Sequence, residues 1–162
     1  MANLKVTIRE ELTLNGYDQG AKNTLTISDV DEVFKRIVTC PANNETTVAR
    51  FRSSVGNASG TATFDSALDV QDVKYVRVSN LDSSNSLTLS LQVEVGEDDS
   101  GADTSASILV EAGKSFILGS PHDGINLSDT NANLVTDLVD LESLVVFTGS
   151  DAIDVEIFVA SV

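Results

Sequence analysis

The chain has 162 residues, a formal net charge of −15, 41% hydrophobic residues, 5% aromatic residues and no tryptophan. This length fits one domain, so we expect residues 1–162 to form a single unit with an aliphatic core. The negative charge argues against nucleic acid as a direct partner, because a phosphate backbone would be repelled. The charge is uneven: residues 1–81 hold nine bases and ten acids, whereas residues 82–162 hold one base and fifteen acids.

The N-terminal sequence and the cysteine content indicate where the chain is made. Residues 1–10 lack the apolar run of a signal peptide, and no segment approaches membrane-spanning length. The single cysteine, Cys40, lies among apolar residues and is most simply a small buried hydrophobe. We therefore expect synthesis in a reducing cytoplasm and no membrane partner.

The first thirty residues predict short strands and a turn. Apolar residues alternate with polar ones over residues 4–14, which is the period of a strand with one buried face. Asn15-Gly16 is a strong turn signal, residues 17–23 are polar and predict a loop, and residues 24–27 predict a second, short strand.

A helix start is expected at Ser28, because three acids follow it within four residues. β-branched residues return in 33–40, so we predict about one helical turn followed by a strand. A longer helix through Val38 is the competing prediction.

The middle of the chain predicts strands at 46–53 and 61–67, the first with a basic stripe that includes Arg50 and Arg52. The longest regular pattern follows, in residues 74–95, where two alternating runs flank a polar loop at 80–86. We interpret residues 74–95 as a long antiparallel hairpin at the centre of a sheet, with the 87–95 run buried on its apolar face.

The last third of the chain predicts an acidic loop at 96–107, a surface loop at 119–130 and two further hairpins. The hairpins are expected at 108–118 and 144–159, and residues 131–140 fit either a helix or a strand. Short strands that recur about every 8–12 residues are typical of sandwiches and barrels. The predicted fold is all-β, a single antiparallel β-sandwich, jelly-roll-like, with minor helix.

Catalytic and metal-binding patterns are weak. His122 is the only histidine and lies in a turn-like Pro-His-Asp-Gly stretch, where an exposed loop residue is a better interpretation than a general base. Four acids in the 96–107 loop could bind calcium, but their spacing does not match an EF-hand, so a solvated loop is favoured. A glycosidase carboxylate pair stays open, although sugar-stacking aromatics are scarce. We expect no enzyme activity, no cofactor and no metal site.

Three stretches suggest a family: Tyr-Val-Arg-Val-Ser-Asn-Leu-Asp at 75–82, Ala-Gly-Lys-Ser-Phe-Ile-Leu-Gly at 112–119, and Thr-Gly-Ser at 148–150 running into a strand that ends the chain. They resemble small virion proteins of tailed bacteriophages, notably those of marine cyanobacteria. The resemblance covers residues 75–162. It implies a non-enzymatic, oligomeric β-sandwich that coats or caps a capsid or joins the tail.

The resemblance leads to the first of three function hypotheses, and the acidic residues lead to the other two. The first is a virion protein made in the host cytoplasm, most directly a capsid cement or decoration protein on the outer surface of the head, or else a neck, tail or fibre component. The second is a calcium-assisted carbohydrate-binding module, and the third is a hydrolase that uses acidic residues. For the first, we expect the major capsid protein or another virion protein as partner, and a homotrimer as the assembled form.

A partner-binding face is expected in the near-neutral first half. The candidate residues are Lys35, Arg36, Arg50 and Arg52, which lie on two successive predicted strands. A basic, partly apolar face would suit an acidic shell or a neighbouring subunit. The alternative is that these four bases lie on unrelated, solvated faces.

Overall fold

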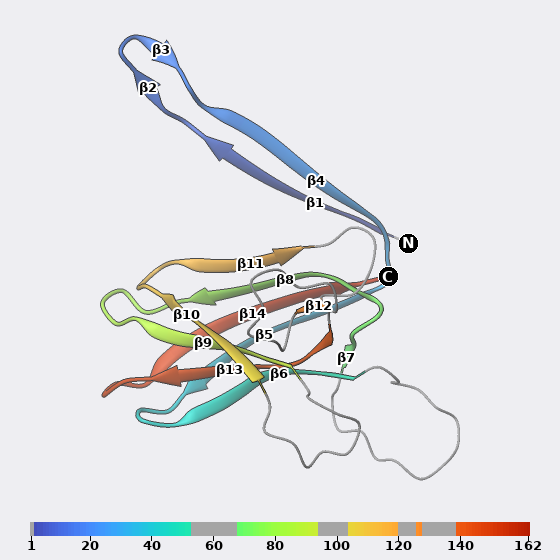
Figure 1. Ribbon diagram of the computed structural model, residues 1–162, viewed down its shortest axis with the longest axis vertical. Helices are drawn as coiled ribbons and strands as arrows, with labels where there is room; N and C mark the ends of the chain where they lie inside the picture. The colour runs from blue at the N-terminus through green and yellow to red at the C-terminus, as the bar shows by residue number, and fades with distance from the viewer. Residues whose placement is uncertain (1, 53–67, 94–103, 120–125, 128–138) are drawn as a thin grey trace.

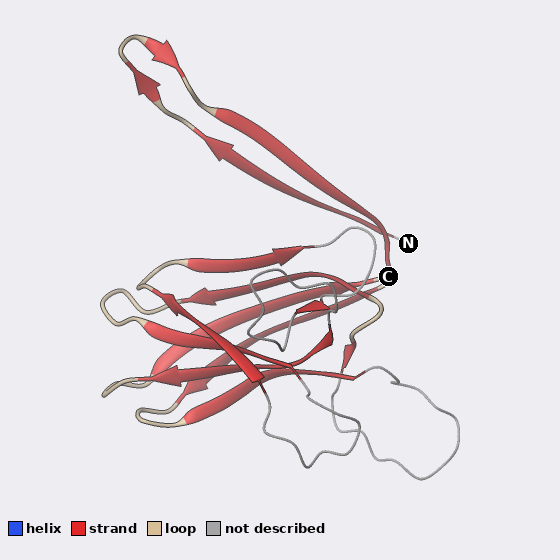
Figure 2. Ribbon diagram, in the orientation of Figure 1, coloured by secondary structure: helices blue, strands red, loops and turns tan. Residues whose placement is uncertain are grey.

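The computed structural model describes residues 2–52, 68–93, 104–119, 126–127 and 139–162, and these are strands and connecting turns without a helix (Figures 1 and 2). They divide into a sandwich-like body and a long hairpin that projects from it (Figure 1). The predicted all-β class is confirmed. The strand predicted at 61–67 and residues 131–138 of the ambiguous segment 131–140 lie outside the described residues, whereas residues 139–140 begin a strand. A jelly-roll connectivity stays a prediction.

Two sheets face each other in the body. The first, which we call the arm-side sheet, has the strand order β11-β8-β14-β5. Its strands are β11 (Ser115–Gly119), β8 (Val73–Asn80), β14 (Ile153–Ser161) and β5 (Glu32–Cys40). The second, the distal sheet, has the order β10-β9-β13-β6-β7, and β12 (Asn126–Leu127) also pairs with β13. Its strands are β10 (Thr104–Val110), β9 (Leu87–Val93), β13 (Val139–Thr148), β6 (Glu45–Arg52) and β7 (Leu68–Asp69). All pairs are antiparallel except β6–β7, which is parallel.

The core lies between the sheets and is aliphatic, as the composition predicts. The largest fully buried side chains include Phe51, Leu89, Leu144 and Ile157, which come from both sheets. In β9 the burial alternates strictly, with Leu87, Leu89, Leu91 and Val93 inside. The predicted buried face of this strand is therefore confirmed as far as Val93. Val95 lies outside the described residues.

All three predicted hairpins of the body are wrong in their pairing. β8 lies in the arm-side sheet and β9 in the distal sheet, and the same division separates β10 from β11 and β13 from β14. Each connection is an arch across the core. The physical reason is that alternation reports which face of a strand is buried, and both strands of an arch bury one face against the same core.

Hydrogen bonds inside and between the arches fix this end of the sandwich. The Asp82 carboxylate accepts from the backbone N–H groups of Ser84 and Asn85, both at 2.7 Å, which folds the 80–86 loop. Neighbouring loops are joined by bonds from Asn80 N to Lys114 O, Leu81 N to Asp154 O, Asn43 N to Gly149 O and Thr148 Oγ1 to Pro41 O. The polar loop residues thus satisfy backbone groups that no strand partner could reach.

The helix expected at Ser28, and its longer form through Val38, are also wrong. β4 (Ala21–Val30) runs through Ser28, and β5 begins two residues after it ends. Asp29, the second-to-last residue of β4, has a φ of 61°, a left-handed conformation that Asp tolerates better than most residues. The β-branched residues that follow favour a strand, and their pairing with β14 outweighs the capping signal.

Candidate functional site: the projecting arm

The structure places residues 2–30 in a hairpin, here called the arm, that leaves the body beside the C-terminus and extends away from it (Figure 1). Its long strands are β1 (Ala2–Glu10) and β4, paired from Glu10↔Ala21 to Ala2↔Val30. At the tip, β2 (Thr13–Leu14) pairs with β3 (Tyr17–Asp18). The sequence predicts these alternating strands, although the loop expected at 17–23 is largely strand.

The tip turn has the conformation that its sequence predicts. Asn15 and Gly16 both have positive φ, 51° and 83°, as a two-residue type I′ hairpin turn requires. This turn matches the natural twist of paired strands, so it fixes the register of Leu14 opposite Tyr17. The arm is therefore a specified structure with a defined end.

The two faces of the arm differ in chemistry. Leu4, Val6 and Ile8 lie on one face of β1, with Leu25 and Ile27 opposite them on β4. The other face carries threonines and the bases Lys5, Arg9 and Lys22, and the last two are direct cross-strand partners. The result is a ribbon with one apolar side and one basic side.

Only the base of the apolar side is covered by the body. Ile27 and Val30 are buried in a small cluster with Tyr75 and Ala160, and Leu4, Val6, Leu25 and Phe158 pack against it. We call Tyr75, Phe158 and Ala160, which lie on the outer face of the arm-side sheet, the arm seat. Tyr75 and Phe158 meet edge to face, with centroids 6.0 Å apart, and burial raises the pKa of the Tyr75 hydroxyl.

A close approach of backbone and side chain helps to hold the base. At Gly119 an added Cβ would lie 3.3 Å from the Leu25 side chain, so a larger residue there would press on the arm. The absence of a side chain at Gly119 lets β11 pass directly beneath β4. Residues of the arm and residues of the body thus both contribute to the attachment of the arm.

Beyond the seat, the apolar side of the arm is exposed. Ile8 is 51% exposed, Leu12 54%, Leu14 56% and Tyr17 72%. An isolated two-stranded hairpin is at best marginally stable in water, and large apolar side chains on its surface lower its solubility. These side chains are what we expect of a segment that a partner covers.

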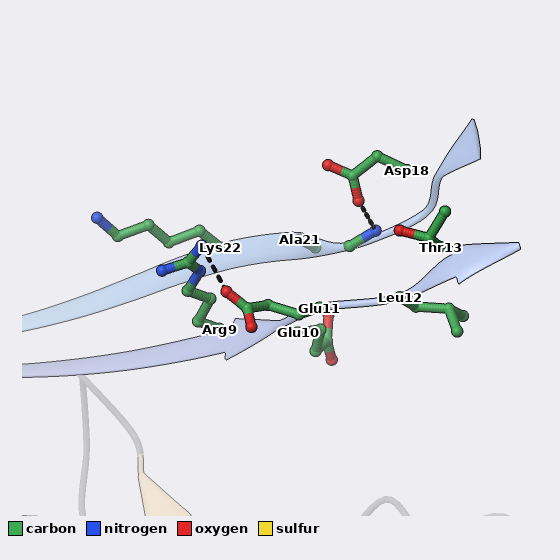
Figure 3. A pocket seen from close by; sticks show the side chains of 9 residues that line it. Arg9, Glu10, Glu11, Leu12, Thr13, Asp18, Ala21 and Lys22 are labelled. Carbon is green, nitrogen blue, oxygen red and sulfur yellow. Dashed lines mark hydrogen bonds and ion pairs between the residues drawn. The ribbon is translucent and has the colours of Figure 1, made fainter. Parts of the chain in front are cut away.

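A hollow of about 570 Å³ lies where the long strands of the arm give way to the tip strands (Figure 3). Arg9 and Glu11 form an ion pair at 2.5 Å beside it, and the Gly20 N–H donates to the Asp18 carboxylate at 2.8 Å. All of its lining residues are exposed and include charges of both signs. It is an open flank of a ribbon, and its geometry offers no shielded place for a reaction.

The structure does not bring the four predicted partner-binding bases onto one face. Lys35 lies on the outer face of the arm-side sheet, where its Nζ is 3.2 Å from Glu156 Oε2, and Glu156 also pairs with Arg77. Arg36 points to the other side of β5, 5.3 Å from the Phe34 ring. Arg50 and Arg52 lie on β6 in the distal sheet, Arg50 exposed and Arg52 half-buried. Whether any of them binds a partner stays a prediction.

The remaining candidates for catalysis or metal binding lie outside the described residues. They are His122 and the acidic residues Glu97, Asp98, Asp99 and Asp103. Over the ranges that the structure does describe, no three His, Cys, Asp or Glu side chains gather as a metal site would require. The same ranges contain no helix that could span a membrane.

Cys40 is fully buried, and burial raises the pKa of its thiol, with a smaller contribution from the charge of Asp154. A raised pKa keeps the thiol protonated and unreactive at neutral pH. This agrees with the sequence-based interpretation of Cys40 as a small buried hydrophobe.

Comparison with known proteins gives no relative: no family model, no curated protein and no solved structure matches the chain.

Proposed function

We propose that this chain is a non-enzymatic structural protein of a tailed bacteriophage virion, most directly a decoration protein on the outer surface of the head. The observation that carries the proposal is the arm. A body with a closed aliphatic core holds out a specified hairpin whose apolar side chains Ile8, Leu12, Leu14 and Tyr17 are at least half exposed. A protein that works by joining other protein subunits needs such a segment, and a catalyst does not.

The virion setting comes from the resemblance of residues 75–82, 112–119 and 148–162 to small phage virion proteins. These stretches form β8, β11, β14 and the arches that meet them, which are the strands that support the arm seat. The charge also fits a shell surface. Excluding the arm, residues 31–162 contain seven bases and twenty-one acids, a net charge of −14 that keeps particles apart by mutual repulsion.

The proposal is tested by cosedimentation. Purified chain is mixed with heads that lack it and sedimented through a sucrose cushion, with heads alone and chain alone as controls. We expect the chain to pellet only with heads, and to saturate at a fixed ratio to the major capsid protein. If electron microscopy of labelled chain shows binding to tails or necks but not to heads, the protein is a tail or neck component and not a head decoration protein. No binding to any particle component would overturn the proposal.

The predicted basic residues allow a second test by cosedimentation. Arg50 is exposed on the distal sheet, on the side of the body opposite the arm seat. If the distal sheet faces an acidic shell, Arg50→Glu weakens pelleting with heads, and Arg50→Lys restores it. Equal pelleting of both variants would remove Arg50 from the binding surface and leave the role of the arm to be decided separately.

A further inference from the structure

We propose that β10 of one copy of this chain pairs with β10 of a second copy, antiparallel and about a two-fold axis at Ser107. The two distal sheets then join into one continuous sheet across this seam. The inference goes beyond the proposed function, because it is a claim about the purified chain alone. It assigns an occupant to the side of the sandwich where the described edge strands, β10 and β11, carry no charge.

The first observation is that β10 is an open edge. Among the described strands it pairs only with β9, and its seven residues pair with that strand without a shift in register (Figure 1). On its other side, an edge strand presents backbone N–H and C=O groups that are a template for another strand. The addition of a strand at such an edge is a common mode of protein recognition.

The second observation is that β10 lacks the features that normally protect an edge. Natural edge strands carry charged side chains, proline or a bulge, which keep other strands away. The β10 sequence, Thr-Ser-Ala-Ser-Ile-Leu-Val, has none of these, although 22% of the chain is charged. By contrast β5, at the other edge of the arm-side sheet, carries Glu32, Lys35 and Arg36. Arg36 even lies on the core-facing side of β5, opposite the buried Ile157, and an inward charge of this kind also protects an edge.

The third observation concerns charge and limits what can bind at this edge. Each copy has a formal net charge of −15, so two copies repel each other except where their contact is free of charge. β10 offers such a contact, and charged residues are depleted at the cores of protein interfaces. Within the described residues, the charges that flank it are Glu111 and Lys114, which have opposite signs. A nucleic acid or a strongly basic segment therefore finds no matching charge on β10.

The fourth observation is that β10 is complementary to itself in a full-length register. Ala106, Ile108 and Val110 lie opposite buried leucines of β9 and form the core-facing row, whereas Ser107 and Leu109 form the outer row. With Ser107 opposite its own copy, all seven residues pair and Ala106 of each copy meets Ile108 of the other. The core-facing rows of the two copies then become continuous. A shift by one residue would join the core-facing row of one copy to the outer row of the other.

A hollow beside β10 lies where this partner would add to the core. Its volume is about 240 Å³, and Ile108 of β10 and Phe116 of β11 are among the residues that line it. Both side chains are partly buried and pack against the core. In the proposed pair, Ala106 of the second copy lies next to Ile108 on the core-facing side, so the seam extends the core at this margin. Leu109 stays on the outer face, where its neighbour across the seam is Ser105.

The test begins with the oligomeric state of the purified full chain, measured by sedimentation equilibrium over a range of protein concentrations. We expect a dimer, because a strand that pairs with its own copy closes with two chains. Ser107 is exposed, and Ser107→Lys should weaken the dimer by roughly tenfold or more, since it sets like charges directly opposite each other at the axis. Ser84→Lys is the matched control, because it adds the same charge in the exposed part of the 80–86 loop. Circular dichroism and the thermal midpoint check that each variant is folded.

Disulfide formation tests the register of the seam. Direct partners on antiparallel strands have Cα atoms about 4.5–5.5 Å apart, which a disulfide can bridge. Ser107→Cys should therefore give a covalent dimer under mild oxidation. Ser105→Cys should not, because its copy in the second chain is displaced by four residues, about 13 Å along the strand. The native Cys40 is fully buried and does not compete.

Three results would overturn the inference. They are a wild-type chain that is monomeric at every concentration, the homotrimer expected from the sequence, and a dimer that Ser107→Lys leaves intact. A covalent dimer with Ser105→Cys and none with Ser107→Cys would overturn the register.

These outcomes are independent of the proposed function. A monomeric chain that still pellets with heads contradicts the seam and leaves the virion role standing. A dimer that cross-links through Ser107→Cys and binds no particle does the reverse.

Discussion

Leu89 lies at the centre of β9 and tests the assignment of the buried face of this strand. Its side chain is fully buried, and its cross-strand partners are Ile108 on β10 and Val146 on β13. Leu89→Ala removes three carbon atoms from the core, worth about 2.4 kcal/mol at about 0.8 kcal/mol per buried methylene. The cavity left behind adds to this, because a core filled from both sheets collapses only in part. We expect a total cost of about 3–4 kcal/mol.

The assay is equilibrium unfolding in urea, followed by far-ultraviolet circular dichroism, with Leu109→Ala as the control. Leu109 is adjacent to the direct partner of Leu89 but is 63% exposed, so its truncation should cost less than about 0.5 kcal/mol. The slope of unfolding free energy against urea should be unchanged in both variants, so that midpoints can be compared. Equal midpoints for the two variants would refute the assignment of the buried face of β9.

Three further predictions concern the polar and thiol groups of the body. Hydrogen bonds from backbone N–H groups lower the pKa of the Asp82 carboxyl. Its contribution to stability is therefore complete above the pKa of an unfolded Asp and is lost as pH falls through the folded-state pKa. The difference in unfolding midpoint between wild type and Asp82→Ala should shrink in acid. Glu156→Gln should cost less than about 1 kcal/mol and lose most of that effect in about 1 M salt, because Lys35 in this ion-pair group is 57% exposed. Cys40 should resist alkylation in the native state and react fully in denaturant, and rapid native alkylation would contradict its burial.

Local features of the fold could be predicted because their causes are local. The alternation in residues 87–93 gave the buried face of β9, and Asn15-Gly16 gave a turn because only residues that tolerate positive φ fit there. The β-branched residues 33–40 predicted a strand even though Ser28 suggested a helix. The predicted helical turn at Ser28 was wrong, because the capping preference of Ser28 is weaker than the pairing of these strands in the folded protein.

Strand partners could not be predicted, because pairing depends on where the core lies. Residues 74–79 and 87–93 look like a hairpin in sequence, yet one joins the arm-side sheet and the other the distal sheet. The arm shows the same limit. Its alternation predicts an apolar face, but nothing in residues 2–30 indicates that only the base of this face would be covered. For the same reason, the sequence could not show that Lys35 and Arg36 lie in a different sheet from Arg50 and Arg52, because β5 and β6 are consecutive strands of different sheets.

The most direct test of a structural role is the copy number of this chain in purified phage particles, measured by quantitative mass spectrometry against the major capsid protein. We expect the wild-type chain at a fixed, reproducible ratio to capsid subunits, and a reduced ratio in particles grown with the Ile8→Asp chain. Absence of the wild-type chain from purified particles would contradict the account.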